Sequence, residues 1–389
     1  MGKRPANGRI LYVTTRKLLD AALAGCTIVV AADRRAGDLA SALERHGAQV
    51  YRAPALTIVP SPDDEELQRR TRELIDSPPD IVLVTTGVGF RGWMEAADEN
   101  DLSGSLHDAL CASQFIARGP KARGAIQQAG FTADWVAESE TAAEVGEYLL
   151  STRLDDKRIA IQHHGAGADD LDHLLAERGA DVVSLTVYRW GPPPDQDIVK
   201  RSVAQAACGE VDAVVFTSAP GASEWLKAAH DGDSLDKIRS RAASGRLLLA
   251  AVGPITAKPL QRARLRTTIA ERGRLGSLVP TVTGYFGASG DVPTLRTEAG
   301  DISLRSGGVV LNGAFIPLSR AGASLLGALF DANGRVLSRD ELAPALPRAG
   351  QNSHAVEVAV ARVREALGHA DIVKTVVKRG YRLAVEVEE

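Results

Sequence analysis

Two stretches of sequence, "TIVVAADRRAGDLASALERHGAQV" (residues 27–50) and "RIAIQHHGAGADDLDHLLAERGADV" (residues 158–182), decide the fold. Each predicts a buried strand, a loop, an amphipathic helix that ends at a glycine, and a second strand. The matching positions, each 132 residues apart, are Leu39 and Leu171, Leu43 and Leu175, Gly47 and Gly179, and Val50 and Val182. The match indicates an internal repeat.

Two further pairs of segments extend the repeat in the same order. Residues 82–87, "VLVTTG", match residues 214–219, "VVFTSA", at the same offset, and residues 117–130 match residues 251–264 at an offset of 134. In each half, short apolar β runs alternate with helical periods, which is the pattern of a parallel sheet with crossover helices. We therefore expect a duplicated α/β fold.

Gly87, Gly89 and Gly92 have the spacing G-x-G-x-x-G directly after the apolar run of residues 81–84. In a dinucleotide-binding fold this motif follows the first strand of a βαβ unit, and an acidic residue ends the next strand. Here the run is an interior strand, so the sequence favours a strand-to-helix turn whose backbone N–H groups can meet an anion. A dinucleotide-dependent enzyme is the alternative, and a turn that binds nothing also fits the pattern.

The composition limits the class of protein. The chain has 389 residues, enough for two or three domains, with 44% hydrophobic and 24% charged residues, as in soluble globular proteins. A net charge of −3 argues against coating nucleic acid along the whole chain but allows a small basic module. Three widely spaced cysteines without C-x-x-C spacing favour a reducing compartment and no zinc site. Without a membrane-length apolar run or a signal-peptide core, we expect a cytoplasmic protein with an N-terminal arm at residues 1–25.

Three motifs of the first 280 residues resemble uroporphyrinogen-III synthase: "FTSAPGASEWL" (216–226), "AAVGPITAKPL" (250–260) and "LTVYRWGPPPD" (185–195). The resemblance covers about residues 27–283. It implies a domain of residues 26–283 with two flavodoxin-like lobes joined by a two-stranded linker. Lobe A would combine about residues 26–57 with 192–283, and lobe B would span about residues 60–187.

The family closes the linear tetrapyrrole hydroxymethylbilane with inversion of its last ring, and it uses no cofactor or metal. The substrate carries eight carboxylates, which helix N-termini and arginines can bind. By residue matching, the resemblance places Tyr188 and Thr256 at catalytic positions. The expected substrate contacts at the strand-end turns are Arg34, Arg35, Thr86, Gly87, Gly119, His163, Ser218 and Gly253. The pair His163-His164 also suggests a metal, but adjacent side chains point to different sides and no third ligand is suitably spaced, so we expect loop histidines.

The last ninety residues predict a different module. A segment rich in Gly, Ser and Thr precedes it, and we expect a linker at residues 284–300 and a separate domain at residues 301–389. Short β runs at residues 302–319, with turn glycines, predict a small antiparallel sheet. Three helices and a closing hairpin at residues 372–387 follow, and Ser338 with Glu341 forms a capping-box pattern at the second helix.

The third helix carries an apolar stripe of Val356, Val360, Val363 and Leu367, and a basic hairpin follows it. This layout predicts a winged helix-turn-helix, whose helix enters the major groove of DNA. The motif "VKTVVKRGYRL" (373–383) resembles the DNA-binding domain of response regulators of the OmpR/PhoB type. The resemblance assigns DNA contacts to His354, Arg362, Arg364, Thr375, Lys378, Arg379 and Tyr381. Because few of these can pair with bases, we expect affinity dominated by phosphate contacts and sensitive to salt.

We therefore expect a transcription regulator in which the synthase-like domain acts as a sensor or docks a partner. Such fusions resemble actinobacterial regulators of nitrate and nitrite assimilation. The alternative is an active or bifunctional uroporphyrinogen-III synthase that carries a DNA-binding tail. The expected partners are promoter DNA, a tetrapyrrole ligand, and RNA polymerase or a second regulator, with no membrane and a location on the nucleoid.

Overall fold

The computed structural model describes residues 21–386 except residues 34, 61–64, 164–169, 272–273, 288–290 and 347–352. The chain divides into two compact units. The first comprises Met1–Leu56 and Pro193–Glu389, and the second comprises Thr57–Pro192. The first unit holds a parallel sheet, here lobe A, and the C-terminal module. The second unit holds another parallel sheet, lobe B.

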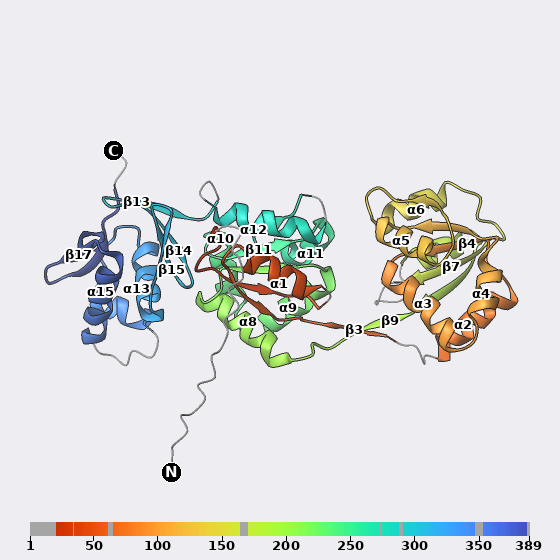
Figure 1. Ribbon diagram of the computed structural model, residues 1–389, viewed down its shortest axis with the longest axis horizontal. Coiled ribbons are helices and arrows are strands. Elements are labelled where there is room, and N and C mark those ends of the chain that lie inside the picture. Colours follow the sequence, from red (N-terminus) through yellow and green to blue (C-terminus); the bar gives the residue numbers. More distant parts are fainter. Residues whose placement is uncertain are drawn as a thin grey trace, which may run out of the picture. The chain divides into compact units, whose positions relative to one another are not determined.

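Lobe A is a five-stranded parallel sheet in the order β12-β11-β10-β1-β2, with helices on both faces (Figure 1). Its strands are β1 (Thr27–Val30), β2 (Gln49–Arg52), β10 (Ala213–Phe216), β11 (Leu248–Ala251) and β12 (Thr268–Ile269). Its helices are α1 (Ala36–Glu44), α8 (Gln196–Cys208), α9 (Ala219–Asp231), α10 (Leu235–Ala243), α11 (Pro254–Arg262) and α12 (Leu278–Phe286), preceded by the 3-10 turn η1 (Leu275–Ser277). Helices α8 to α11 pack on one face and α1 with α12 on the other.

Lobe B repeats this arrangement in the order β6-β5-β4-β7-β8. Its strands are β4 (Ile81–Val84), β5 (Gln114–Ala117), β6 (Ala133–Val136), β7 (Arg158–His163) and β8 (Asp181–Thr186). Its helices are α2 (Glu65–Asp76), α3 (Gly87–Glu99), α4 (Ser103–Leu110), α5 (Pro120–Gln128), α6 (Ala142–Leu150) and α7 (Asp170–Glu177). Helices α2 to α5 cover one face and α6 with α7 the other. An antiparallel pair, β3 (Thr57–Pro60) with β9 (Tyr188–Gly191), ends this unit.

The sheet orders match position for position, which confirms the duplication. The first repeat supplies β1 and β2 to lobe A and β4 to β6 to lobe B, whereas the second supplies β7 and β8 to lobe B and β10 to β12 to lobe A. Each lobe is therefore built from half of each repeat.

Buried tryptophans show the same duplication at atomic detail. The indole Nε1 of Trp93 donates a hydrogen bond to the hydroxyl of Thr71 at 3.0 Å, and Trp225 does the same to Ser202 at 3.0 Å. Each hydroxyl in turn donates at 2.7 Å to a carbonyl one turn earlier in its own helix, that of Leu67 or Val199. Both indoles are fully buried, so a hydroxyl acceptor is needed at each place.

Close packing accounts for the glycines of the G-x-G-x-x-G motif. A Cβ on Gly87 would lie 2.3 Å from the main-chain oxygen of Lys121, and one on Gly89 would lie 1.9 Å from the side-chain nitrogen of Gln162. Both glycines stand in the first turn of α3, where the helix approaches its neighbours. Their requirement therefore follows from packing within lobe B.

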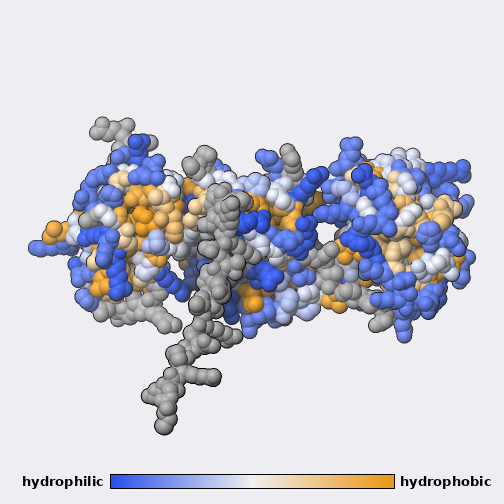
Figure 2. Space-filling view, viewed as in Figure 1, coloured by the Kyte–Doolittle hydropathy of each residue, from blue (hydrophilic) through white to orange (hydrophobic). Residues whose placement is uncertain are grey.

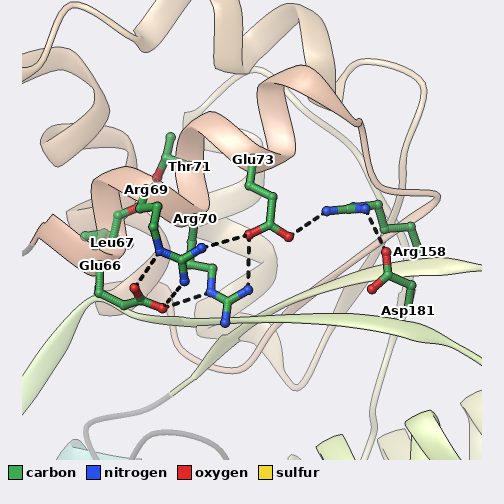
Figure 3. Close-up of polar contacts among 8 residues, drawn as sticks. All are labelled: Glu66, Leu67, Arg69, Arg70, Thr71, Glu73, Arg158 and Asp181. Atoms are coloured by element: carbon green, nitrogen blue, oxygen red, sulfur yellow. Dashed lines mark hydrogen bonds and ion pairs between the residues drawn. The ribbon is translucent and has the colours of Figure 1, made fainter.

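A chain of ion pairs fastens α2 to the amino edge of the lobe B sheet (Figure 3). Arg158, at the start of β7, donates to Glu73 of α2 at 2.8 Å and to Asp181 of β8 at 2.7 Å. On α2, Glu73 also pairs with Arg70, which shares Glu66 with Arg69. The hydrogen bonds from Arg69 and Arg70 outweigh desolvation and lower the pKa of Glu66.

The C-terminal module begins with a four-stranded antiparallel sheet, and a two-stranded hairpin closes it (Figure 1). Its strands are β13 (Thr294–Thr297), β14 (Gly300–Arg305), β15 (Gly308–Leu311), β16 (Ala314–Pro317), β17 (Val373–Val376) and β18 (Gly380–Leu383). Its helices are α13 (Arg320–Asp331), α14 (Arg339–Leu342) and α15 (Ser353–Leu367), with 3-10 turns η2 (Ala343–Ala345) and η3 (Ala370–Ile372). The capping box of Ser338 and Glu341 is present.

Two segments differ from the sequence-based expectation. Strand β13 falls within the segment expected to be a linker, because its main chain pairs with β14. Leu23 falls within the expected N-terminal arm, yet its side chain is fully buried against lobe A and its N–H donates to the carbonyl of His46. Residues 1–20 lie outside the described residues.

Candidate functional site

Helix α15 presents one face to the module core and the other to solvent. Val356, Val360, Val363 and Leu367 are at most 4% exposed, as the apolar stripe predicts. Among the expected contacts, His354 and Arg362 are exposed on the solvent face. His354 lies 3.8 Å from Glu357, which also pairs with Arg339 of α14 at 2.8 Å. The exposed face therefore carries separated charges, and these suit phosphate contacts more than dense base recognition.

Arg364 connects α15 to the hairpin. Its Nε donates to the carbonyl of Val373 at 2.9 Å, and its Nη2 donates to the hydroxyl of Thr375 at 2.8 Å. Both acceptors lie on β17. These bonds occupy the planar donors of the guanidinium, so Arg364 and Thr375 fix the hairpin relative to the helix.

The turn between β17 and β18, here called the wing tip, consists of residues 377–379. Lys378 and Arg379 are exposed, and Lys378 has a φ of 61°. Val377 is 79% exposed, and Figure 2 shows an apolar spot among hydrophilic atoms at the tip of this hairpin. Tyr381, by contrast, is 6% exposed and packs in the module core, with Arg339 over its ring at 5.9 Å. The exposed cations at the tip are therefore Lys378 and Arg379.

The strand-end turns of the two lobes have matching caps. Thr86 accepts from the N–H of Gly89 at 3.0 Å, and Ser218 accepts from the N–H of Gly221 at 3.2 Å. The N–H of Thr86 also donates to Gln162 at 3.2 Å. These side chains thus satisfy donors of their own helices, as N-caps do.

The two glycine-proline turns differ from each other. A Cβ on Gly119, before α5, would lie 3.0 Å from Cγ of Glu140, so an acidic side chain lies beside this turn. Gly253 precedes α11, and Thr256 in the first turn of that helix is 6% exposed. A carboxylate beside Gly119 opposes an anion there, whereas the structure places no such contact beside Gly253 among its described neighbours.

Tyr188 and Arg35 occupy contrasting surroundings. Tyr188 is 7% exposed and packs in the lobe B core. Arg35 is exposed at the N-cap of α1 with a φ of 55° and pairs with Asp38 at 3.1 Å. Arg34 and His164 lie outside the described residues.

His163 ends β7 in a buried polar cluster. Its Nε2 lies 2.9 Å from Oδ1 of Asp172 on α7, and the hydroxyl of Ser184 on β8 donates to the same oxygen. His163 is 1% exposed and lines a small pocket with Thr85 and Arg118. The part of the chain that the structure describes contains no group of three His, Cys, Asp or Glu side chains suited to a metal.

A buried junction joins lobe A to the C-terminal module. Asp212, before β10, accepts from the N–H of Thr27 at 2.7 Å and from the N–H of Ser306 at 2.8 Å, and the Ser306 hydroxyl bonds to both residues. Burial raises the pKa of Asp212, although its hydrogen-bond donors oppose the shift. Beside it, the N–H of Gly307 donates to the carbonyl of Gly25 at 2.9 Å.

Further contacts surround this junction. A Cβ on Gly25 would lie 2.0 Å from the ring of Phe315, so these two segments pack directly. Arg246 of lobe A pairs with Asp331 of the module at 2.6 Å, and Arg320 of the module pairs with Glu210. Sequence reasoning missed this junction, although Asp212 matches Asp80 at the repeat offset.

Within the described ranges, no helix has the length and apolar character to cross a membrane.

Residues 37–280 match the family model described as Uroporphyrinogen-III synthase HemD. The chain belongs to this family. The HemD match covers most of both parallel sheets, and residues 313–383 match the model described as Transcriptional regulatory protein, C terminal. The HemD domain is therefore fused to a DNA-binding domain of the OmpR/PhoB type, as the sequence motifs predict.

Relatives of the HemD domain include proteins of different standing. The chain is 24% identical over 266 residues to "Uncharacterized protein YjjA" of Bacillus subtilis, covering 68% of this chain and 97% of the relative. It is 23% identical to a "Putative uroporphyrinogen-III synthase" of Methanothermobacter thermautotrophicus, over 66% of this chain and 97% of that protein. A uroporphyrinogen III synthase structure from Thermus thermophilus aligns with a TM-score of 0.55 at 28% identity, over 66% of this chain and 97% of that one.

Proposed function

We propose that this protein is a transcription regulator in which the HemD domain senses an anionic ligand and controls DNA binding by the C-terminal module. The observation that carries the proposal is the buried bonding of Ser306 to Asp212. A flexible tether would leave the DNA-binding module independent of the HemD domain, whereas buried hydrogen bonds make its position depend on lobe A.

Strand β10 gives this coupling a short physical route. Asp212 precedes the strand and holds Ser306, while Ser218 follows the strand and caps α9. A ligand that contacts the Ser218 turn would bias an element whose other end holds the module. Coupling of this kind is a free energy shared by two sites, so DNA must alter ligand affinity by the same factor.

DNA binding is tested with the full chain and fluorescent promoter duplexes. Arg362→Ala and Arg379→Ala are expected to weaken binding to all duplexes and to reduce the salt slope by roughly 0.9 for each lost phosphate contact. Arg296→Ala is the matched control, because Arg296 is an exposed arginine of the same module that pairs with Glu386. If the parent chain does not bind duplexes at low salt, the regulator proposal fails.

Sensing is tested with uroporphyrin, a stable octacarboxylate. Saturating uroporphyrin is expected to change the DNA affinity of the parent chain, and Asp212→Ala is expected to abolish that change while uroporphyrin still binds. Unchanged DNA affinity in the parent, with uroporphyrin bound, would contradict the sensor role.

We further propose nitrate or nitrite assimilation as the regulated process. The support is the resemblance of the fused architecture to actinobacterial regulators, together with chemistry: nitrite reductase requires sirohaem, which is made from uroporphyrinogen III. Genome-wide promoter occupancy tests this proposal and would also reveal co-bound RNA polymerase or a second regulator. Occupancy confined to unrelated promoters would reject it.

An active or bifunctional synthase is the second candidate, favoured by the likeness to the Thermus thermophilus uroporphyrinogen III synthase. Incubating the full chain with hydroxymethylbilane tests it. Formation of only the uninverted isomer, as in buffer alone, would remove the enzyme, and Tyr188→Phe would test the role assigned to that side chain.

A further inference from the structure

A small pocket lies at the carboxyl edge of the lobe B sheet. Its polar lining is Thr85, Arg118 and His163, and its apolar lining includes Leu83, Val145 and Ile161. The volume is about 10 Å³, the size of one water molecule. The pocket therefore accepts the tip of a polar group and not a ring.

The histidine in this pocket has one nitrogen in use. Asp172 accepts at 2.9 Å from Nε2 of His163 and also from the Ser184 hydroxyl, so this carboxylate favours a proton on Nε2. Nδ1 has no hydrogen-bond partner within the described residues, although the side chain is 1% exposed. Buried polar atoms are almost always paired, so Nδ1 needs a partner that enters the pocket.

The neighbouring groups define the chemistry of that partner. Arg118 contributes a permanent positive charge to the lining, while the Thr85 hydroxyl already donates to the carbonyl of Gln162 at 2.7 Å. The hydroxyl proton is thus used inside the protein, and the donors left for a ligand are the guanidinium and, once protonated, Nδ1. Two cationic donors around a one-oxygen space suit a carboxylate.

We propose that this pocket binds one carboxylate oxygen of an anionic ligand between Arg118 and Nδ1 of His163. Binding brings one proton from solution onto Nδ1, which then donates to the ligand, while Asp172 remains the counter-charge at Nε2. A tetrahedral anion fits less well, because its other oxygens would meet the apolar lining. This inference rests on the proposed sensing role of the HemD domain and names its ligand class.

The test uses the full chain with ¹⁵N-labelled histidine. Propionate serves as a free carboxylate, uroporphyrin as a carboxylate on a larger body, and phosphate as the tetrahedral anion. With propionate or uroporphyrin, the Nδ1 signal of His163 is expected to move from the unprotonated to the protonated position, and phosphate is expected to leave it unchanged. Response to uroporphyrin alone would identify the larger body as the source of the carboxylate.

The matched variants are His163→Gln and His173→Gln. Glutamine at 163 keeps a donor to Asp172 but lacks Nδ1, and uroporphyrin binding is expected to weaken roughly tenfold to a hundredfold. His173 is exposed on the same helix as Asp172, so its substitution is expected to leave affinity unchanged. The spectroscopic arm needs no variant and decides the matter if His163→Gln does not fold.

An Nδ1 signal that ignores both carboxylates would overturn the proposal, as would a protonated signal in the absence of any ligand. Affinity for promoter duplexes without ligand is measured in parallel. Loss of the carboxylate response with intact DNA binding refutes the pocket alone, whereas absent DNA binding refutes the regulator and leaves the pocket result standing.

Discussion

Asp80 and Asp212 hold the same position in the two lobes, 132 residues apart, but in different surroundings. Each precedes a central strand and accepts a main-chain N–H from the neighbouring strand, that of Arg158 or Thr27. Asp80 is exposed, and its hydrogen bond with Lys157 lowers its pKa. Asp212 lies under Ser306, and burial raises its pKa. The duplicated aspartate thus became the attachment point of the DNA-binding module in one lobe only.

This pair provides a matched test of the junction. Asp212→Ala leaves the buried N–H groups of Thr27 and Ser306 without an acceptor and is expected to lower the free energy of unfolding by roughly 2–4 kcal/mol. Asp80→Ala removes an exposed ion pair and is expected to cost about 0–1 kcal/mol. Urea unfolding of both variants measures the difference, and equal losses would contradict a junction that stabilises the fold.

Arg364 should position the hairpin and not bind phosphate by its charge. Arg364→Lys keeps the charge but cannot bond Val373 and Thr375 together, so we expect a loss of about 1 kcal/mol in stability and weaker DNA binding. Arg362→Lys, on the exposed face of the same helix, is expected to retain most affinity. Thermal unfolding and duplex titration check both, and full affinity of Arg364→Lys would show that its charge alone matters.

Gly87 should tolerate no side chain. Gly87→Ala places a Cβ 2.3 Å from the main-chain oxygen of Lys121, so α3 and α5 must separate, at a cost of about 1–3 kcal/mol. Gly124 of α5 has open space around its Cα, and Gly124→Ala is expected to stabilise by about 0.5–1 kcal/mol. Denaturant midpoints of the two variants should therefore move in opposite directions.

Glu341 makes the stability of the C-terminal module depend on acid. Hydrogen bonds from Arg335 and from the N–H and hydroxyl of Ser338 lower the pKa of Glu341 from 4.5 to about 2. A carboxyl with a depressed folded pKa stabilises above its unfolded value, and that contribution is lost as pH falls from about 4.5 to about 2. Glu341→Gln is expected to flatten the fall of Tm across this window. A parallel fall in both chains would show that other groups set the acid limit.

Sequence periodicity was sufficient for the two sheets and the α15 stripe, because buried strands and amphipathic helices leave repeating apolar patterns. It could not predict the acceptors of Arg364, since a main-chain carbonyl such as that of Val373 has no sequence signature. Nor could it predict that Glu140 packs beside Gly119, because that contact depends on the path of a loop. The bond between Asp212 and Ser306 joins residues 94 positions apart that each resemble ordinary surface residues.

Cys26 adjoins the same junction, next to Gly25, and is 1% exposed, and burial raises its pKa well above that of a free thiol. A thiol that is both buried and protonated reacts slowly with alkylating reagents, while Cys111 and Cys208 are exposed. The protein therefore contains its own probe of docking: faster alkylation at position 26, located by peptide mass, would mark molecules whose DNA-binding module has separated from lobe A.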